Sequence, residues 1–393
     1  MEKCIRLSLV AVMLFMLGAS CLAATSTGAD YQELKIGMSG VMTGPAAAWS
    51  LPSYQALVMR VEEINAAGGL TIGEKKYMIK VYAEDNKFEV PAAITAMEKL
   101  VYRDKVHVMY TYGGPPILAT QEKLEKIPML HFIMGWDVKF RDPKYPYTYS
   151  PGMSPADFAK EFLEWAKKAY PVRTLKVLGE NTQGGWQNDE PARKAAAAAG
   201  FEVLPSEFYE PGTSDFYSLI SRLEAAKVDA VLCVQVPPRA TGLLLKQRDE
   251  LGSKLLVIHW AGNPEETMKI AGKACENNFV MRHTDFSATP KLKAFDESYR
   301  KRWNESPMLF SQEGYDFVGI YAKAVEKAGK IDLQSVKAAL DDPAFVYEGL
   351  MGTYRWGGKS LYGRNVDMYY PIGVAVIKEG KVKNVAIIPI APK

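Results

Sequence analysis

The amino-acid sequence predicts an α/β protein whose parallel sheets are covered by helices. Short apolar runs rich in β-branched residues alternate with helical patterns from residue 34 to residue 260, with little filler between them. This alternation is typical of parallel sheets with helices on both faces. One interruption, the segment 142–151 rich in proline and tyrosine, splits the alternation into two series. A chain of 393 residues is long enough for two domains, so the two series indicate two lobes.

The first series begins with an apolar strand over residues 34–39. Helical spacing of apolar residues follows over residues 50–67 and ends at two glycines, which commonly stop a helix. The same criteria predict the remaining elements of this series, which are strand 76–83, helix 91–102, strand 106–112, helix 116–125 and strand 129–134.

The junction between the third strand and its helix is the most informative stretch of this series. An apolar run rises to Gly113 and Gly114, and two prolines then open the helical pattern. Proline suits the first turn of a helix, and glycine lets a ligand approach the backbone. Free N–H groups at a helix start favour an anion, and ligands of open α/β sheets bind at the carboxyl ends of strands. The alternative is an ordinary connection that binds nothing.

The second series starts with a helix over residues 157–169, capped by Ser154 and the proline after it. Its further predicted elements are strand 174–179, helix 190–199, strand 200–208, helix 216–226, strand 229–236, helix 238–251 and strand 254–260. The tail departs from this alternation. Its patterns predict helices 292–303, 312–328 and 333–340, then a hairpin over 372–388 that turns at residues 378–381.

The first 24 residues have the layout of a secretory signal. Basic residues precede the apolar run 7–17, and small residues follow it; the run is too short to span a membrane. Two cleavage routes are open. Cleavage after Ala23 or Ala24 would release a free protein, whereas a lipobox-like route would leave Cys21 lipidated. Both routes predict a protein that works outside the cytoplasm.

Composition excludes several classes of partner and site. The formal net charge of +3 predicts neither nucleic acid nor membrane lipid as a partner. The four histidines show no metal-ligand spacing, and no phosphate-binding, dinucleotide-binding or nucleophile-elbow motif is present in the sequence. We therefore expect no metal, no cofactor and no catalysis. Beyond the signal, Cys233 and Cys275 either pair, as export permits, or remain thiols, and Cys233 suits a buried strand position.

A family resemblance covers nearly the whole chain after the signal. The stretch LKIGMSGVMTGPAAAWSLPSYQALVMRVEEINAAGGL resembles the opening of periplasmic solute-binding proteins of the branched-chain amino acid type. Further matches, in the same order and spacing as in that family, are YAEDNKFEVPAAITAMEKLVYRDKVHVM, GTSDFYSLISRLEAAKVDAVLCV and EGYDFVGIYAKAVEKAG. The chain thus resembles the solute-binding protein of an ABC importer.

The resemblance implies a type I periplasmic-binding-protein fold, in which two doubly wound lobes are joined by three chain crossings and close over a ligand. It assigns residues 31–149 and 286–344 to the first lobe, and 150–285 and 345–393 to the second. It also implies a monomer that delivers its ligand to a membrane permease, by hinge closure. A sensory module serving a separate receptor, or an α/β enzyme, is the alternative.

The family's contact positions fall on residues of this chain that differ from the usual ones. The first loop supplies an aromatic residue near Trp49. The turn after the third strand commonly offers hydroxyl groups to a ligand carboxylate, and here it carries glycines. The resemblance and the strand ends together give ten candidate ligand-binding residues, which are Trp49, Tyr112, Gly113, Gly114, Gly135, Trp136, Asp137, Trp186, Trp260 and Glu265.

The loss of hydroxyl groups places the usual α-amino-acid recognition in doubt, and the aromatic residues favour a larger, flatter or more apolar ligand than leucine. A carboxylate would bind the amides of Gly113 and Gly114. An ammonium group would pair with Asp137 or Glu265 and gain cation–π attraction from the rings. Arg239 is a further carboxylate partner if it is not simply solvated, and His259 is a minor candidate.

Overall fold

The computed structural model describes residues 31–44 and 46–393. The predicted signal segment 1–24, with its lipidation candidate Cys21, lies outside the described residues. Two large sheets carry most of the described strands, as the alternation predicted. The strands of a small third sheet come between β11 and β15 of the second large sheet in chain order. None of the helices in the described ranges combines the length and apolarity needed to cross a membrane.

The first large sheet has the order β2-β3-β1-β4-β5-β6. Only β2 is antiparallel to its neighbour; the other pairings are parallel. The strands are β1 (Gln32–Gly40), β2 (Leu70–Ile72), β3 (Lys75–Asp85), β4 (Val108–Tyr112), β5 (Leu130–Met134) and β6 (Thr148–Tyr149). The helices of this part are α1 (Ala47–Ala66), α2 (Val90–Glu98) with a π-helical turn at Lys99–Arg103, α3 (Gly114–Leu124), and the 3-10 turn Val138–Arg141.

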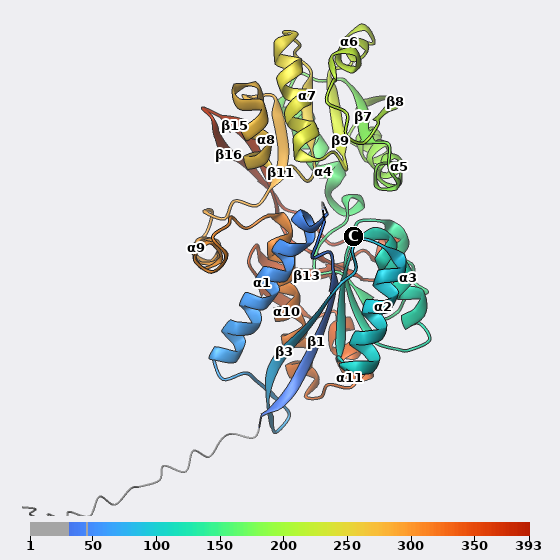
Figure 1. Cartoon of the computed structure of the whole chain (residues 1–393), viewed down its shortest axis with the longest axis vertical. Helices are drawn as coiled ribbons and strands as arrows, with labels where there is room; N and C mark the ends of the chain where they lie inside the picture. The colour runs from blue at the N-terminus through green and yellow to red at the C-terminus, as the bar shows by residue number, and fades with distance from the viewer. Residues whose placement is uncertain (1–30, 45) are drawn as a thin grey trace, which may run out of the picture. The chain divides into compact units, whose positions relative to one another are not determined.

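Both faces of this sheet are apolar, because helices cover both (Figure 1). Successive residues of a strand point to opposite faces. On one face Tyr110 of β4 stacks on Phe317, with ring centroids 4.6 Å apart. On the other face Met109 packs with Leu100 and Leu124, which belong to the helices following β3 and β4. The near-continuous apolar run in β4 is therefore explained by burial on two sides.

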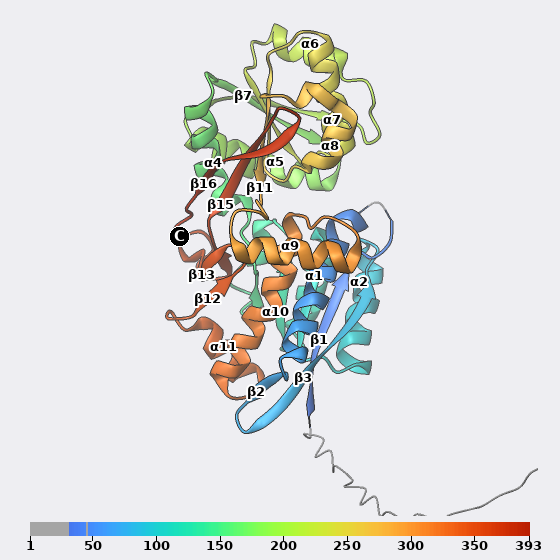
Figure 2. The ribbon, with the colours of Figure 1, turned by 90° about the vertical axis from the view of Figure 1, so that its left-hand side faces the viewer.

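Helices of the tail return to this first sheet. They are α10 (Leu309–Ala328) and α11 (Leu333–Asp341). α10 runs along α1 in Figures 1 and 2. Gly314 makes this approach feasible, because a Cβ at that position would lie 2.0 Å from the backbone oxygen of Ser53. α9 (Pro290–Trp303) packs on the same pair of helices through Phe295 and Tyr299.

The second large sheet has the order β16-β15-β11-β10-β9-β7-β8. Its strands are β7 (Thr174–Glu180), β8 (Glu202–Tyr209), β9 (Ala230–Val234), β10 (Leu256–His259), β11 (Phe279–His283), β15 (Ile372–Lys378) and β16 (Lys381–Ile388). Its helices are α4 (Pro155–Ala169), α5 (Gln183–Ala198), α6 (Tyr217–Ala225), α7 (Pro238–Glu250) and α8 (Pro264–Ala271) with the 3-10 turn Gly272–Cys275. Ser154 and Asp157 form the predicted N-terminal cap of α4.

The predicted tail hairpin is confirmed as β15 and β16, which add to the parallel strands in antiparallel fashion. Its turn contains Glu379 and Gly380, both with positive φ. β11 and α8 carried no prediction, because the apolar run of β11 is only a few residues long and is followed by charged side chains. Cys233 and Cys275 are both buried and unpaired, so the disulfide alternative does not apply.

Residues 346–369 belong to neither large sheet. They form the antiparallel order β12-β13-β14, with β12 (Val346–Gly349), β13 (Gly352–Gly357), β14 (Asp367–Tyr369) and the short α12 (Lys359–Tyr362). Asp316 of α10 anchors them, since its carboxylate accepts bonds from the amide of Leu350 (3.2 Å) and the hydroxyl of Tyr354 (2.7 Å). This sheet was not predicted from the sequence, because its strands are too short for a clear alternation.

A buried ion pair and a buried hydrogen-bond chain stand where the chain crosses between the large sheets. The Nε of Arg141 donates to Asp367 Oδ2 over 2.6 Å, and both side chains are fully buried. Glu313 of α10 accepts a bond from the hydroxyl of Tyr370 (3.3 Å), which itself accepts one from Arg282 (3.1 Å).

We expect Asp367→Ala to lower the free energy of unfolding by about 3–5 kcal/mol, the range for a buried ion pair that loses one partner. Arginine stays charged at all accessible pH values, so the guanidinium of Arg141 would remain buried without its carboxylate. Urea denaturation measures the change. Glu202→Ala, which removes the exposed partner of Arg173, is the control and should change stability little. Equal effects of the two substitutions would contradict the prediction.

Candidate ligand-binding site

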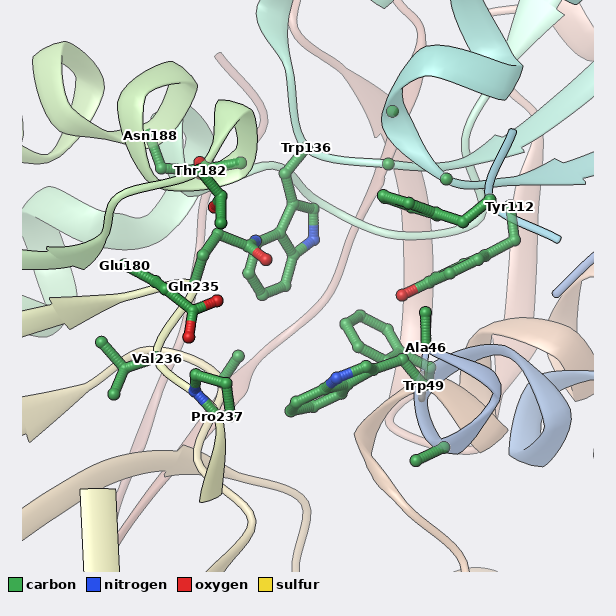
Figure 3. Close-up of a pocket in the computed structure, with 18 of the residues that line it drawn as sticks. Ala46, Trp49, Tyr112, Trp136, Glu180, Thr182, Asn188, Gln235, Val236 and Pro237 are labelled. Atoms are coloured by element: carbon green, nitrogen blue, oxygen red, sulfur yellow. The ribbon is translucent and has the colours of Figure 1, made fainter. Parts of the chain in front are cut away.

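A cavity of about 670 Å³ lies at the carboxyl ends of strands from both large sheets. One wall comes from the segments after β1, β3, β4 and β5 and from the start of α10. The other wall comes from the segments after β7, β9 and β10. This is the place where α/β sheets bind ligands, because the loops leaving parallel strands gather there. Figure 3 shows side chains from both walls pointing into the space.

The first wall, formed by the half that contains β1 to β6, is aromatic. Its rings belong to Trp49, Phe88, Tyr112, Trp136, Phe140 and Phe310. Phe310 is the centre of this group. Its ring centroid lies 6.1 Å from that of Trp49, 6.5 Å from that of Tyr112 and 5.6 Å from that of Trp136. Such spacing is typical of favourable edge-to-face and tilted pairs. The wall is thus a preassembled apolar surface.

The turn after β4 offers fewer donors than predicted. Gly113 lines the cavity with φ +103, and its N–H donates to the carbonyl of Met134 over 3.4 Å. The next three residues form the first turn of α3, and Pro115 and Pro116 have no N–H. Gly114 therefore supplies the one free amide of this turn. The predicted pair of glycine amides for a carboxylate is corrected to a single donor.

The turn after β5 carries the predicted Gly135, Trp136 and Asp137, and all three line the cavity. Arg141 shapes this turn, because its Nη1 donates to the carbonyls of Gly135 (3.0 Å) and Asp137 (3.2 Å). The Asp137 side chain accepts from the amide of Lys139 (2.9 Å) and so caps the following 3-10 turn. Figure 3 shows the Trp136 ring between the two walls.

The second wall is polar. Its hydrogen-bonding and charged side chains are Glu180, Thr182, Gln183, Gln187, Asn188, Gln235, Arg239, Asn263 and Glu266. Burial raises the pKa of Glu180 above its usual value. Figure 3 shows the carboxylate of Glu180 pointing into the cavity beside Gln235. The wall carries one guanidinium and two carboxylates, so it can pair with either sign of charge on a ligand.

His259 also lines the cavity, but both ring nitrogens are already used. Nε2 lies 3.0 Å from the carbonyl of Val236, and Nδ1 accepts from the amide of Ala261 over 3.1 Å. Burial lowers the pKa of His259 to about 4. The ring is thus a neutral brace between the segments after β9 and β10. His259, a minor ligand-binding candidate from the sequence, therefore has a structural role instead.

Three of the ten predicted residues lie outside the cavity lining: Trp186, Trp260 and Glu265. Trp186 is 56% exposed, and its Nε1 donates to Asn181, on the outer side of the first turn of α5. Trp260 is fully buried. Its neighbours His259 and Ala261 face the cavity, and the two-residue period turns Trp260 into the core. Glu265 precedes Glu266, which takes the lining position on α8.

The remaining seven predicted residues do meet at the cavity, and the structure adds others that the sequence did not single out. Phe88 and Glu180 stand at strand exits, a position that a stricter use of strand ends could have found. Phe310 and Met308 could not be found in this way, because they reach the cavity from a helix start far along the chain. Among the described residues, no group of three metal-ligating side chains occurs.

Comparisons with known proteins agree with this architecture. A family model described as "Periplasmic binding protein" matches residues 33–375. The chain is 28% identical over 330 residues to the leucine-, isoleucine-, valine-, threonine- and alanine-binding protein of Pseudomonas aeruginosa, covering 81% of this chain and 84% of that protein.

Two solved structures share the fold. One is the branched-chain amino acid transporter substrate-binding protein of Streptococcus pneumoniae in complex with isoleucine, with a TM-score of 0.74, 20% identity, and coverage of 92% of this chain and 100% of the other. The other is an ABC transporter solute-binding protein of R. palustris in complex with benzoate, with a TM-score of 0.74, 15% identity, and coverage of 92% and 98%.

We expect His259 to stay neutral down to about pH 5, because burial lowers its pKa to about 4 and disfavours the charged ring. The neutral ring then contributes stability above the unfolded pKa of about 6.5 that is lost as the pH falls toward the folded pKa. NMR titration of the imidazole C–H resonances, with a His259→Gln variant for assignment, measures this. An inflection near pH 6.5 for His259 would contradict the prediction.

Proposed function

Since the chain belongs to the periplasmic binding protein family, and within it to the branched-chain amino acid type, we propose that it is the extracytoplasmic solute-binding component of an ABC importer. The predicted signal segment 1–24 supports a periplasmic location, either free or anchored at Cys21. The protein would act as a monomer and hand its ligand to the membrane permease. Its partners in this role are a small molecule and the permease subunits.

The proposed ligand is a small amino-acid-like or carboxylate compound with an apolar, preferably aromatic, body. The ring cluster around Phe310 carries this proposal, because it forms a flat apolar wall before any ligand arrives. Arg239 lines the cavity and makes no ion pair with another described residue, so it is the proposed partner for a carboxylate. Glu180 is the proposed partner for an ammonium group. Two structural neighbours support this range of ligands, because one binds benzoate, an aromatic carboxylate, and the other binds isoleucine, an amino acid.

Binding would bring the two lobes together around the ligand. We propose residues 31–149 and 286–344 as the first lobe and residues 150–285 and 345–393 as the second. Within the second set, the segment 346–369 contacts the first lobe through Asp316. The cavity walls come from different sheets, so a ligand that touches both favours the closed arrangement through its contacts with each. The closed arrangement would then be recognised by the permease. The proposal involves capture and release without chemical change of the ligand, as for the relatives, which are binding proteins.

The first experiment is a thermal-shift screen of the protein against branched-chain and aromatic amino acids and against aromatic and aliphatic carboxylates. A compound that binds only the folded state raises the melting temperature by mass action. Isothermal titration calorimetry then gives the dissociation constant of each compound that responds. Failure of every amino acid and carboxylate to raise the melting temperature would count against the proposal.

We expect Trp136→Ala to weaken binding of the responding compounds by about 1–2 kcal/mol, or roughly 5- to 30-fold, because it removes a large ring from the cavity. Trp186→Ala is the matched control. It removes the same side chain from a position outside the cavity lining and should leave the dissociation constant unchanged. A loss of affinity in the control that equals the loss in Trp136→Ala would place the site elsewhere.

A further inference from the structure

We propose that Phe88 is a specificity-determining residue, which makes the turn after β4 an apolar contact for a ligand ring. Its ring occupies the space that a side chain at position 113 would need. The site would therefore select compounds that present a flat ring to this wall, and their charged groups to the second wall. This inference rests on the proposed function and deepens it.

The loop that carries Phe88 has an unfavourable backbone conformation. Lys87 has φ +52 and Phe88 has φ +62, so two consecutive residues with a Cβ occupy the left-handed region. This region costs free energy for residues other than glycine, and such conformations cluster at ligand contacts, where the surrounding structure enforces them. Phe88 lines the cavity while 43% of its surface remains exposed, so a ligand can still cover it.

The surrounding contacts do enforce this conformation. Asn86 is fully buried, and its Nδ2 donates to the carbonyls of Ser39 (3.1 Å) and Tyr112 (2.9 Å). Its Oδ1 accepts from the amide of Phe88 (3.0 Å). The side chain of Asp85 accepts from the amide of Lys87 (2.9 Å). The loop after β3 is thus tied to the ends of β1 and β4, and these hydrogen bonds hold the backbone of Phe88 in place.

Gly113 and Phe88 depend on each other. A Cβ at position 113 would lie 2.8 Å from Cδ2 and 2.9 Å from Cε2 of the Phe88 ring. The φ of +103 at Gly113 is also restricted to glycine. No hydroxyl side chain can therefore stand at position 113 while Phe88 holds its place. The aromatic ring and the missing hydroxyl are two aspects of one arrangement.

The chemistry of this corner follows from these contacts. The ring centroid of Phe88 lies 6.5 Å from that of Tyr112, and the turn between them offers a carboxylate only the amide of Gly114. A carboxylate placed here would lose its hydration and regain one hydrogen bond, which is unfavourable. A ring placed here would cover apolar surface that water now touches. The ligand class inferred is therefore a ring-bearing acid or amino acid, oriented with its ring toward Phe88.

The test compares Phe88→Ala and Phe88→Leu with the wild-type protein by calorimetry. The probes are two matched pairs, 3-phenylpropanoate with 4-methylpentanoate and phenylalanine with leucine. We expect Phe88→Ala to raise the dissociation constants of the ring-bearing probes at least fivefold and those of the aliphatic probes less than twofold. Phe88→Leu keeps apolar bulk and guards against a folding defect. Tyr102→Ala, which removes an aromatic ring 60% exposed and outside the cavity, is the control and should change nothing.

Several binding outcomes would overturn the inference. Equal changes for ring-bearing and aliphatic probes, or no change in either variant, would remove the selectivity assigned to Phe88. Binding of the aliphatic probes alone to the wild-type protein would also refute this inference while leaving the proposed function intact. If none of the four probes bound the wild-type protein, the ligand class inferred here would be refuted, whereas the proposed function would fall only if the whole thermal-shift screen also failed.

A stability measurement tests the same arrangement without a ligand. Gly113→Ala should lower the melting temperature more than Gly68→Ala, because Gly68 has a similar φ of +98 but open space around the added Cβ. In the Phe88→Ala background the excess loss at position 113 should disappear. An excess that persists without the ring would show that Phe88 does not occupy the space of a side chain at position 113.

Discussion

The buried carboxylate of Glu313 is the contact on which the arrangement of the two large sheets depends. Burial raises its pKa to about 7, and the nearby positive charge of Arg282 opposes that rise. Tyr370 connects the two groups, because its hydroxyl is bonded to both. Gly152 stands so close that a Cβ there would lie 2.3 Å from a carboxylate oxygen of Glu313. Three segments that cross between the sheets thus meet at one polar group, and each is held at a defined place.

This junction gives the cavity its two different walls. A second buried pair, Arg141 with Asp367, joins the last crossing to the turn that carries Trp136. The same arginine therefore shapes the aromatic wall and binds the tail of the chain. Arg141 thus bonds both the turn that carries Trp136 and the crossing at Asp367.

The cavity is divided into an aromatic and a polar wall. Prolines replace N–H donors at the start of α3, and Phe88 excludes a side chain at Gly113. Hydrogen-bonding groups instead gather after β7, β9 and β10. Such a site is suited to a compound with an apolar ring at one end and charged groups at the other, because each end then meets the surface that solvates it best.

The sequence by itself determined the α/β class, the two series of strands and helices, the tail hairpin and the family, because these depend on local periodicity and on motifs in order. It also placed Trp49, Tyr112, Trp136 and their neighbouring glycines at the cavity, since strand ends can be located from the sequence. Only the tertiary structure decided which side chains at those ends face the ligand. Trp260 turned into the core and Trp186 outward, because one residue along a strand, or a fraction of a helical turn, reverses the direction of a side chain. Phe310 and the small third sheet depend on contacts between distant segments, which no local pattern records.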